Sequence, residues 1–129
     1  MISVIIPAHN EELYLRQTLA AVNQQRYPAY ETIVVANGCA DRTVEVAREQ
    51  CERVLVLAEK GLGPARNEGA RAARGELLLF LDADTLLAPD ALQAIAERFG
   101  RKHAAGTIKG VPDQPRVGYR VMYFCKNLI

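Results

Sequence analysis

Residues 77–84 read Leu-Leu-Leu-Phe-Leu-Asp-Ala-Asp, an apolar run of five residues that ends in two aspartates. A short apolar run without polar alternation is typical of a strand that is buried on both faces, as in a parallel sheet. Three earlier stretches have the same character and are richer in β-branched residues: 3–8, 32–36 and 54–57. The sequence therefore predicts four parallel strands, the last of which ends at the two carboxylates.

The segments between these strands have the apolar spacing of helices. Leu15, Leu19 and Val22 recur at i, i+4 and i+7, and the next two connecting segments show similar spacing. A fourth helix is expected to begin at Pro89, a favoured first position, and to end at Gly100. Strands that alternate with helices form right-handed crossovers. The predicted fold class is therefore α/β, a doubly wound, mostly parallel sheet with helices on both faces.

The composition fits one globular domain and excludes several classes of partner. The chain has 129 residues, of which 50% are hydrophobic and 24% charged, and its net charge is +1. No global field therefore favours nucleic acid or an anionic membrane surface. No apolar run approaches the ~20 residues that span a bilayer, and the N-terminus lacks the features of a signal peptide. Three cysteines without a C-x-x-C pair favour a reducing, cytoplasmic setting over a disulfide framework or zinc site.

The pattern changes after residue 100. Residues 104–109 are compatible with a fifth strand, residues 110–115 resemble a turn, and the apolar, aromatic residues 117–129 predict a helix. We expect residues 1–129 to form a single domain in which the pattern defines residues 101–129 least.

Ligands of parallel sheets bind beyond the carboxyl ends of the strands, so the residues after each strand are candidates for function. Asp82 and Asp84 lie there at spacing i, i+2. Two carboxylates this close favour a divalent cation with oxygen ligands, which would keep coordination sites for phosphate. The alternative is that an aspartate at a strand end only starts a turn. The buried run before Asp82 favours the functional interpretation.

The loop that follows the third strand suits an anion. Residues 60–69, Lys-Gly-Leu-Gly-Pro-Ala-Arg-Asn-Glu-Gly, combine glycines, a helix start and two cations, of which Arg66 could contact phosphate. The alternative is that Gly69 and the alanines after it let the helix pack closely on the sheet while the arginines are solvated. Both interpretations can hold at once.

Two other loops carry polar residues with local explanations. Residues 7–12 read Pro-Ala-His-Asn-Glu-Glu, where Asn10 is expected to be the N-cap residue of the first helix. Capping does not explain His9, which could stack on or hydrogen-bond a ligand. Asn37-Gly38 is a turn signal, and Asp41 or Thr43 is expected to cap the second helix.

Taken in order, four stretches resemble the family 2 glycosyltransferases with a GT-A fold. They are Val-Ile-Ile-Pro-Ala-His-Asn-Glu-Glu (4–12), Ile-Val-Val-Ala-Asn-Gly-Cys-Ala-Asp-Arg-Thr (33–43), Gly-Leu-Gly-Pro-Ala-Arg-Asn-Glu-Gly (61–69) and Leu-Phe-Leu-Asp-Ala-Asp (79–84). The resemblance implies a sugar donor joined to a nucleoside diphosphate, a divalent metal, Mg²⁺ or Mn²⁺, and inversion at the anomeric carbon. The acceptor stays open between a saccharide, a lipid and a small molecule, and a lipid would bring the protein to the inner face of the membrane.

The resemblance also implies roles for particular residues. Arg66 would lie near the pyrophosphate, Asp82 would meet the ribose or the metal, and Asp84 would hold the metal on the diphosphate. A metal and a guanidinium would stabilise the departing diphosphate, and a carboxylate base would take the proton of the acceptor hydroxyl. The full set of donor-binding residues implied is Pro7, Ala8, His9, Glu11, Ala36, Asn37, Arg66, Asp82 and Ala83, with Asp84 and Asp82 as metal ligands.

Two departures from the family pattern limit this assignment. Where the family commonly has Asp-Asp-Gly-Ser, residues 36–39 read Ala-Asn-Gly-Cys, which leaves the nucleobase undefined. Only 129 − 84 = 45 residues follow Asp84, and they contain no Glu-Asp pair to supply the base. We therefore expect a truncated chain that contains the donor-binding half of a transferase, and its self-association through the surface left open.

Two alternatives to an active transferase remain. The first is a fragment that binds donor and metal without activity of its own. The second is a phosphatase of the haloacid-dehalogenase class, because residues 80–85, Phe-Leu-Asp-Ala-Asp-Thr, approximate that motif, in which the first aspartate is a nucleophile. This motif expects Thr or Val where the chain has Leu86, and it follows a first strand rather than a fourth, so the phosphatase is the less favoured alternative.

Overall fold

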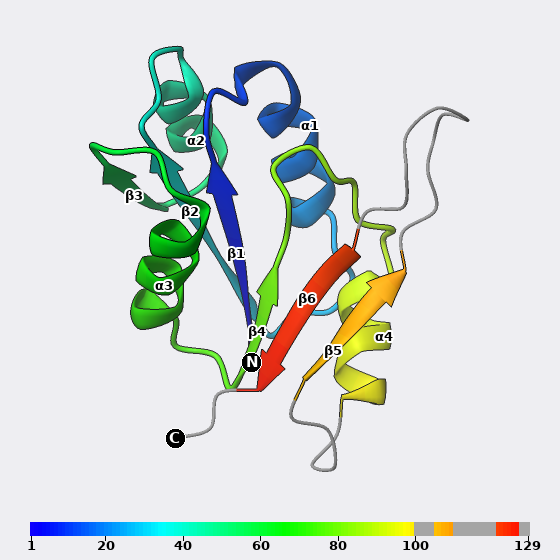
Figure 1. Ribbon diagram of the computed structural model, residues 1–129. Coiled ribbons are helices and arrows are strands. Elements are labelled where there is room, and N and C mark those ends of the chain that lie inside the picture. The colour runs from blue at the N-terminus through cyan, green and yellow to red at the C-terminus, as the bar shows by residue number, and fades with distance from the viewer. Residues whose placement is uncertain (100–104, 110–120, 127–129) are drawn as a thin grey trace.

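The computed structural model of the chain describes residues 1–99, 105–109 and 121–126. Strands and helices alternate through the first eight elements, as the sequence predicts, and two strands follow (Figure 1). The elements in order are β1 (Ile2–Ala8), α1 (Glu12–Asn23), β2 (Tyr30–Asn37), α2 (Thr43–Gln50), β3 (Arg53–Leu57), α3 (Leu62–Ala72), β4 (Leu77–Phe80), α4 (Ala91–Arg98), β5 (Ala105–Lys109) and β6 (Val121–Lys126).

The strands form one sheet in the order β3-β2-β1-β4-β6-β5. The first four in this order are parallel, with Val4 of β1 opposite Thr32 of β2 on one side and Leu79 of β4 on the other. β6 is antiparallel to both β4 and β5. The prediction of a mostly parallel α/β sheet is confirmed.

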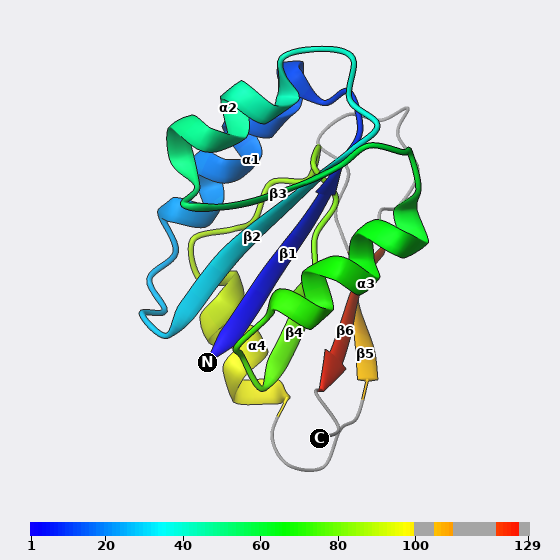
Figure 2. The ribbon, with the colours of Figure 1, turned by 90° about the vertical axis from the view of Figure 1, so that its left-hand side faces the viewer.

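Helices cover both faces of the sheet, as predicted. The side chains of β1 alternate between the faces: Ile2, Val4 and Ile6 pack with α1, α2 and α4, whereas Ile5 packs with α3. Figure 2 shows α3 on one side of the sheet and α1 and α2 on the other. Every residue of β1 is buried, which explains why this strand has no polar alternation.

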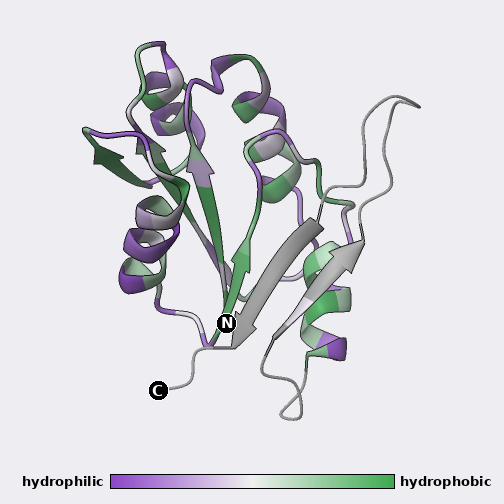
Figure 3. Ribbon diagram, in the orientation of Figure 1, coloured by the Kyte–Doolittle hydropathy of each residue, from purple (hydrophilic) through white to green (hydrophobic). Residues whose placement is uncertain are grey.

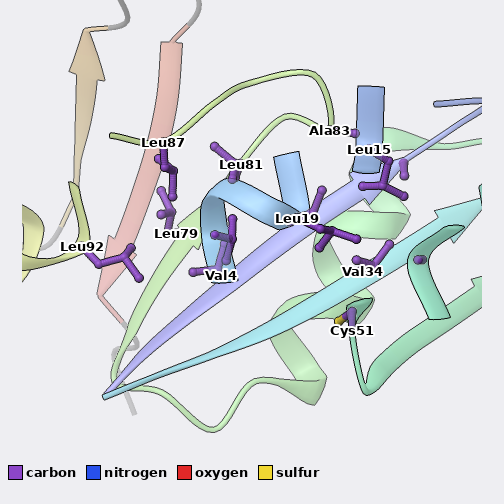
Figure 4. Packing of buried hydrophobic residues seen from close by; sticks show 14 of the residues in the cluster. Val4, Leu15, Leu19, Val34, Cys51, Leu79, Leu81, Ala83, Leu87 and Leu92 are labelled. Atoms are coloured by element: carbon purple, nitrogen blue, oxygen red, sulfur yellow. The ribbon is translucent and has the colours of Figure 1, made fainter. Parts of the chain in front are cut away.

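The larger core cluster lies between the sheet and α1, α2 and α4 (Figure 4). Leu15 and Leu19 of α1 meet Val4 and Leu79 of the sheet, and all four are fully buried. Truncating one of them to alanine would cost about 2–5 kcal/mol of folding free energy. In Figure 3, β4 is hydrophobic along its length, whereas the helices carry hydrophilic as well as hydrophobic residues. Leu15, Leu19 and Val22 are all buried, so the predicted helical spacing marks the buried face of α1.

The helix α3 lies very close to the other face of the sheet. A Cβ atom at Gly69 would come within 2.3 Å of Ile5 Cγ2 and 3.2 Å of Val35 Cγ2. A side chain at this position would force the helix away from the sheet. The close-packing interpretation of residues 60–69 is therefore correct for Gly69.

Some predicted element ends were wrong. The helix α4 begins at Ala91 rather than Pro89, and the loop after α1 reaches its start: Arg26 N donates to Pro89 O, and Leu92 N donates to Gln25 Oε1. Asn10 is not the N-cap residue of α1, because it has a left-handed backbone with φ 50° and its Oδ1 accepts from Ala40 N.

The helix predicted over residues 117–129 was also wrong where the structure describes this segment. Val121–Lys126 forms the strand β6, which pairs with β4 and β5 and so gives its backbone groups partners from two neighbours. The fifth strand predicted over 104–109 is confirmed as β5. The predicted turn at 110–115 and the helix end at Gly100 lie outside the described residues.

Candidate functional site

A pocket of ≈ 340 Å³ lies beyond the carboxyl ends of the parallel strands. Sites for small molecules commonly have about 300–1,000 Å³, so the pocket can hold a molecule of that class. The loops after β1 to β4 gather at this edge of the sheet (Figure 1). The lining residues come from the ends of β1 and β2, from the loops after β1, β3 and β4, and from the start of α3: Pro7, His9, Glu11, Asn37, Lys60, Leu62, Asp82, Ala83 and Asp84.

The loop after β4 presents its two aspartates to the pocket because the residue between them is held in the core. Ala83 is 4% exposed and belongs to the main core cluster. Its carbonyl oxygen accepts a 2.6 Å hydrogen bond from Thr18 Oγ1 of α1, and Thr85 N donates to Asp82 O at 3.1 Å. Thr18 was not among the predicted site residues, because a hydroxyl on the buried face of α1 is the only indication of its role in the sequence.

The imidazole of His9 is held at both ring nitrogens, by the backbone of Asn37 at the end of β2 and by the side chain of Asn10. His9 Nδ1 lies 2.8 Å from the carbonyl oxygen of Asn37, which can only accept, so Nδ1 carries the proton. Nε2 lies 3.3 Å from Asn10 Nδ2 and therefore accepts. The carbon edge and the face of the ring make neither of these hydrogen bonds and can contact a ligand.

Asn37 joins the loops on either side of β2. Its Nδ2 donates to Ala8 O at 3.1 Å and to Val35 O at 3.3 Å, and its Oδ1 accepts from Gly61 N at 2.9 Å. The residue is 3% exposed. The buried amide thus makes hydrogen bonds with both of its polar atoms.

Gly38 explains why the chain can turn at this point. Its φ is +58°, and a Cβ atom here would lie 2.5 Å from Lys60 N. Only glycine combines a left-handed backbone with such a close approach at no steric cost. The predicted turn at Asn37-Gly38 is confirmed, and it brings the loop that contains Lys60 against the end of β2.

The first turns of α1 and α2 cap one another. Glu11 N donates to Thr43 Oγ1 at 2.9 Å and Glu12 N to Asp41 Oδ2 at 3.3 Å, while Arg42 N donates to Glu12 Oε2 at 3.3 Å. Asp41 Oδ1 also accepts from Thr43 N at the start of α2. Burial raises the pKa of Asp41, but its hydrogen bonds to Thr43 and to the Glu12 amide outweigh burial, so the pKa lies below its ordinary value. Thr43 therefore fixes the backbone of the pocket residue Glu11.

Three predicted donor-binding residues do not line the pocket. Ala8 and Ala36 are each 1% exposed, at the ends of β1 and β2. Arg66 lies in α3, with its guanidinium carbon 5.9 Å from the centre of the Phe80 ring. A cation over an aromatic face is a stabilising arrangement that also fixes the arginine side chain. Contact of these residues with a donor stays a prediction.

The pocket also contains two residues that the predicted set omitted. Lys60 was noted as a cation of the loop but was not assigned a role, and Leu62 is 53% exposed at the start of α3. Their signal in the sequence was their position directly after the third strand. Lys60 brings a positive charge to a pocket that holds three carboxylates.

The sequence model of one family, glycosyl transferase family 2, matches residues 3–124. The chain belongs to this family. The phosphatase alternative is therefore set aside, since the aspartates follow the fourth strand of a family 2 chain.

Curated relatives of the chain are glycosyltransferases by name. It is 40% identical over 91 residues to glycosyltransferase AglE of Haloferax volcanii, covering 64% of this chain and 30% of the relative. It is 31% identical over 116 residues to a poly-beta-1,6-N-acetyl-D-glucosamine synthase of Staphylococcus epidermidis, covering 86% and 28%. The chain thus spans less than a third of the length of either relative.

Solved structures with the same fold are GT-A glycosyltransferases, and two of them contain a nucleotide ligand. Mannosyltransferase PcManGT of Pyrobaculum calidifontis, in complex with GDP-Man and Mn²⁺, is 28% identical with a TM-score of 0.74, covering 81% of this chain and 34% of that one. TarS 1-349 of S. aureus, in complex with UDP, is 32% identical with a TM-score of 0.67, covering 74% and 31%.

None of the helices in the described part of this family 2 chain has the length and apolar character needed to span a membrane.

The donor atoms in the pocket fit a divalent cation that shares its coordination with a ligand. Across the described ranges, no group of three or more His, Cys, Asp or Glu side chains is arranged to hold a metal alone. Asp82 and Asp84 offer two carboxylates, and Mg²⁺ or Mn²⁺ commonly takes one or two from the protein with phosphate and water completing its shell. Together with Glu11 they outweigh the charge of Lys60, so a diphosphate here needs added positive charge.

Proposed function

We propose that the pocket binds the nucleoside diphosphate of an activated sugar, together with Mg²⁺ or Mn²⁺ at Asp84 and Asp82, and that the parent reaction is glycosyl transfer with inversion. The observation that carries the proposal is the meeting of both aspartates with His9, Asn37 and Lys60 in one pocket of a family 2 chain. The GDP-Man, Mn²⁺ and UDP complexes of the similar structures support this ligand class.

Different residues of the pocket would contact different parts of the donor. Asp82 and Asp84 are held toward the pocket by Thr18 and Ala83, which provides fixed negative charge for a cation. The cation, when bound, supplies positive charge that stabilises the diphosphate leaving group. The Lys60 ammonium adds a second positive charge on the loop after β3. The ring of His9, fixed by Asn37 and Asn10, provides a rigid surface for the nucleoside.

Calorimetric titration with UDP, GDP and other nucleoside diphosphates, each with Mn²⁺ and with a chelator, tests the proposal. We expect binding to one base that requires the metal. Asp84→Asn should weaken metal-dependent binding by about 100-fold, or ~2.7 kcal/mol, because the cation loses a charged ligand.

The matched control is Asp90→Asn, which makes the same change at an exposed residue that pairs with Arg26 outside the pocket. This variant should bind as the unaltered protein does. Equal Mn²⁺-dependent affinity of the Asp84→Asn variant would refute the metal assignment. Absence of binding to every nucleotide would refute the donor site.

A further inference from the structure

We propose that Asn37 is a positioning residue, whose side-chain amide acts as a surrogate peptide group at the end of β2 and holds the two pocket loops on either side of that strand. The nucleotide part of this inference rests on the proposed function. The part that concerns the loops does not, because it can be measured without any ligand.

The hydrogen bonds of Asn37 continue the pattern of the sheet. β2 lies between β1 and β3, and a peptide group in a parallel sheet donates to one neighbour and accepts from the other. The Asn37 side chain does the same: Nδ2 donates to Ala8 O, the last residue of β1, and Oδ1 accepts from Gly61 N, beyond β3. The amide thus joins the flanking chains beyond the point where the strands end.

The two chain segments held in this way carry pocket residues. Ala8 is followed by His9, and Gly61 lies between Lys60 and Leu62. His9 Nδ1 donates to the backbone carbonyl oxygen of Asn37 at 2.8 Å, a contact that a change of the side chain does not itself remove. The side chain acts on His9 through Ala8 O: Nδ2 holds the loop after β1 where the imidazole reaches this backbone oxygen.

The chemistry of the site requires an amide. Two carbonyl oxygens, those of Ala8 and Val35, lie 3.1 and 3.3 Å from Nδ2. A carboxylate in this place has no proton to donate and would face both oxygens with like partial charge. A leucine has the same length and branching and makes no hydrogen bond, which leaves Ala8 O and Gly61 N without the partner that Asn37 provides.

The first test compares Asn37→Leu with the unaltered protein by NMR in the absence of ligand. The exchange rate of the Gly61 amide proton should rise by at least about tenfold, as for the loss of one buried hydrogen bond. The ¹⁵N signature of His9 should shift from the pure Nδ1-H tautomer toward a mixture, because Nδ2 no longer holds the loop after β1 where the imidazole reaches the backbone oxygen of residue 37. Amides in the centre of β1 should keep their exchange rates.

The second test measures the affinity for the nucleoside diphosphate that the unaltered protein binds, well below the melting temperature. Asn37→Leu should weaken binding by about tenfold, since the two loops are no longer fixed relative to each other. The matched control is Asn23→Leu, where Nδ2 donates to Gln50 O at 3.1 Å at the far end of α1. This variant should change neither the affinity nor the His9 tautomer.

Asn37→Asp separates the hydrogen bond of Nδ2 to Ala8 O from that of Oδ1 to Gly61 N. It also replaces the leucine variant in the tests if that variant does not fold. It keeps the acceptor for Gly61 N and loses the donor to Ala8 O, so Gly61 should stay protected while the His9 tautomer changes. A general loss of stability would affect both readouts together. The positioning role would be overturned if Asn37→Leu left the Gly61 exchange rate, the His9 tautomer and the nucleotide affinity unchanged. The same holds if the variant lowered the melting temperature and changed none of these three. If the unaltered protein binds no nucleoside diphosphate, the proposed function fails and the ligand-free readouts decide this inference.

Discussion

Two polar clusters lie at opposite ends of β1, and their carboxylates differ in what surrounds them. At the amino end, Glu31 Oε1 accepts from Ser3 Oγ and from Arg74 N, each at 2.6 Å, and Oε2 accepts from Arg53 Nη1 at 2.6 Å. Gly75 N also donates to Ser3 Oγ at 2.8 Å. At the carboxyl end, the pocket carboxylates surround a space of ≈ 340 Å³. The first group, Ser3, Glu31, Arg53, Arg74 and Gly75, is called the amino-end cluster below.

This difference indicates that the amino-end cluster contributes to folding stability and the pocket residues to binding. The side chain of Glu31 is 13% exposed, and its partners belong to the starts of β1 and β3 and to the segment after α3, so its charge stabilises the fold. The carboxylates of Glu11, Asp82 and Asp84 instead line a space that a cation or a ligand can enter. Changes in the amino-end cluster should therefore alter stability without altering binding.

The largest effect on stability is expected from Glu31→Ala. The substitution removes the acceptor of Ser3, Arg74 and Arg53 and leaves a half-buried guanidinium without its carboxylate. The free energy of unfolding should fall by about 3 kcal/mol. Urea denaturation measures this change, and titration of the folded variant should give unchanged nucleotide affinity.

Glu49→Ala is the control for this prediction. It removes the ion pair with Arg16, in which both side chains are about half exposed, 54% and 46%. Water solvates both charges in the absence of the pair, so stability should hardly change. Equal losses in the two variants would show that the amino-end cluster is no more than a set of surface contacts.

A smaller loss is expected from Gly75→Ala in the same cluster. The new Cβ atom would lie 2.6 Å from Ser3 Oγ and 2.7 Å from Met1 O and Ser3 N, so backbone must move. We expect a loss of about 2 kcal/mol, measured as a lower midpoint in urea at unchanged slope.

Gly63→Ala makes the same change where nothing beyond the chain neighbours lies within 4 Å of the new Cβ atom. Gly63 is in the first turn of α3 and precedes Pro64, whose ring opposes a helical backbone at a residue with a Cβ atom and so offsets the helix propensity of alanine. Stability should therefore change by less than about 0.5 kcal/mol. A loss at Gly63 as large as that at Gly75 would contradict the steric argument at Gly75.

The sequence predicted the parallel part of the fold because its strands are buried on both faces. Such strands appear as continuous apolar runs, and β1 and β4 show this most clearly. β6 was missed for a related reason: its residues Val-Met-Tyr-Phe-Cys-Lys are apolar without a period that separates strand from helix. Pairing with β4 and β5 makes this segment a strand, and these partners are distant from it in the sequence.

The site was predicted as far as strand ends and residue types could indicate it. Asp82, Asp84, His9 and Asn37 meet in the pocket because parallel strands end at one edge. The hydrogen bonds that orient the site were not predictable, since Thr18 contacts Ala83 across 65 positions in the sequence and Asn37 contacts Ala8 across 29. Local rules likewise placed the cap of α1 at Asn10, whereas the N-cap residue is Glu11, and the amides of Glu11 and Glu12 donate to Thr43 of α2 and to Asp41 just before it.

The smallest effect that separates the two ends is a pH dependence of stability. Burial raises the pKa of Glu31, but hydrogen bonds from Ser3, the Arg74 amide and Arg53 outweigh burial, so the pKa in the folded protein lies below its ordinary value. A lowered pKa contributes stability above the unfolded value of about 4.3, and this contribution disappears as the pH falls through the folded pKa. Protonation of Glu31 removes the negative charge of the amino-end cluster and lowers the stability of the fold without unfolding it.

Urea denaturation from pH 7 to pH 3.5 tests this sign with the Glu31→Gln variant, which cannot titrate. At pH 7 the unaltered protein should be the more stable of the two, and the difference should shrink once the pH drops below about 5. Both curves contain the titration of every other acid, so their difference isolates Glu31. Curves that stay parallel down to pH 3.5 would mean that the Glu31 charge does not stabilise the fold, and the contrast between the two ends of β1 would then rest on packing alone.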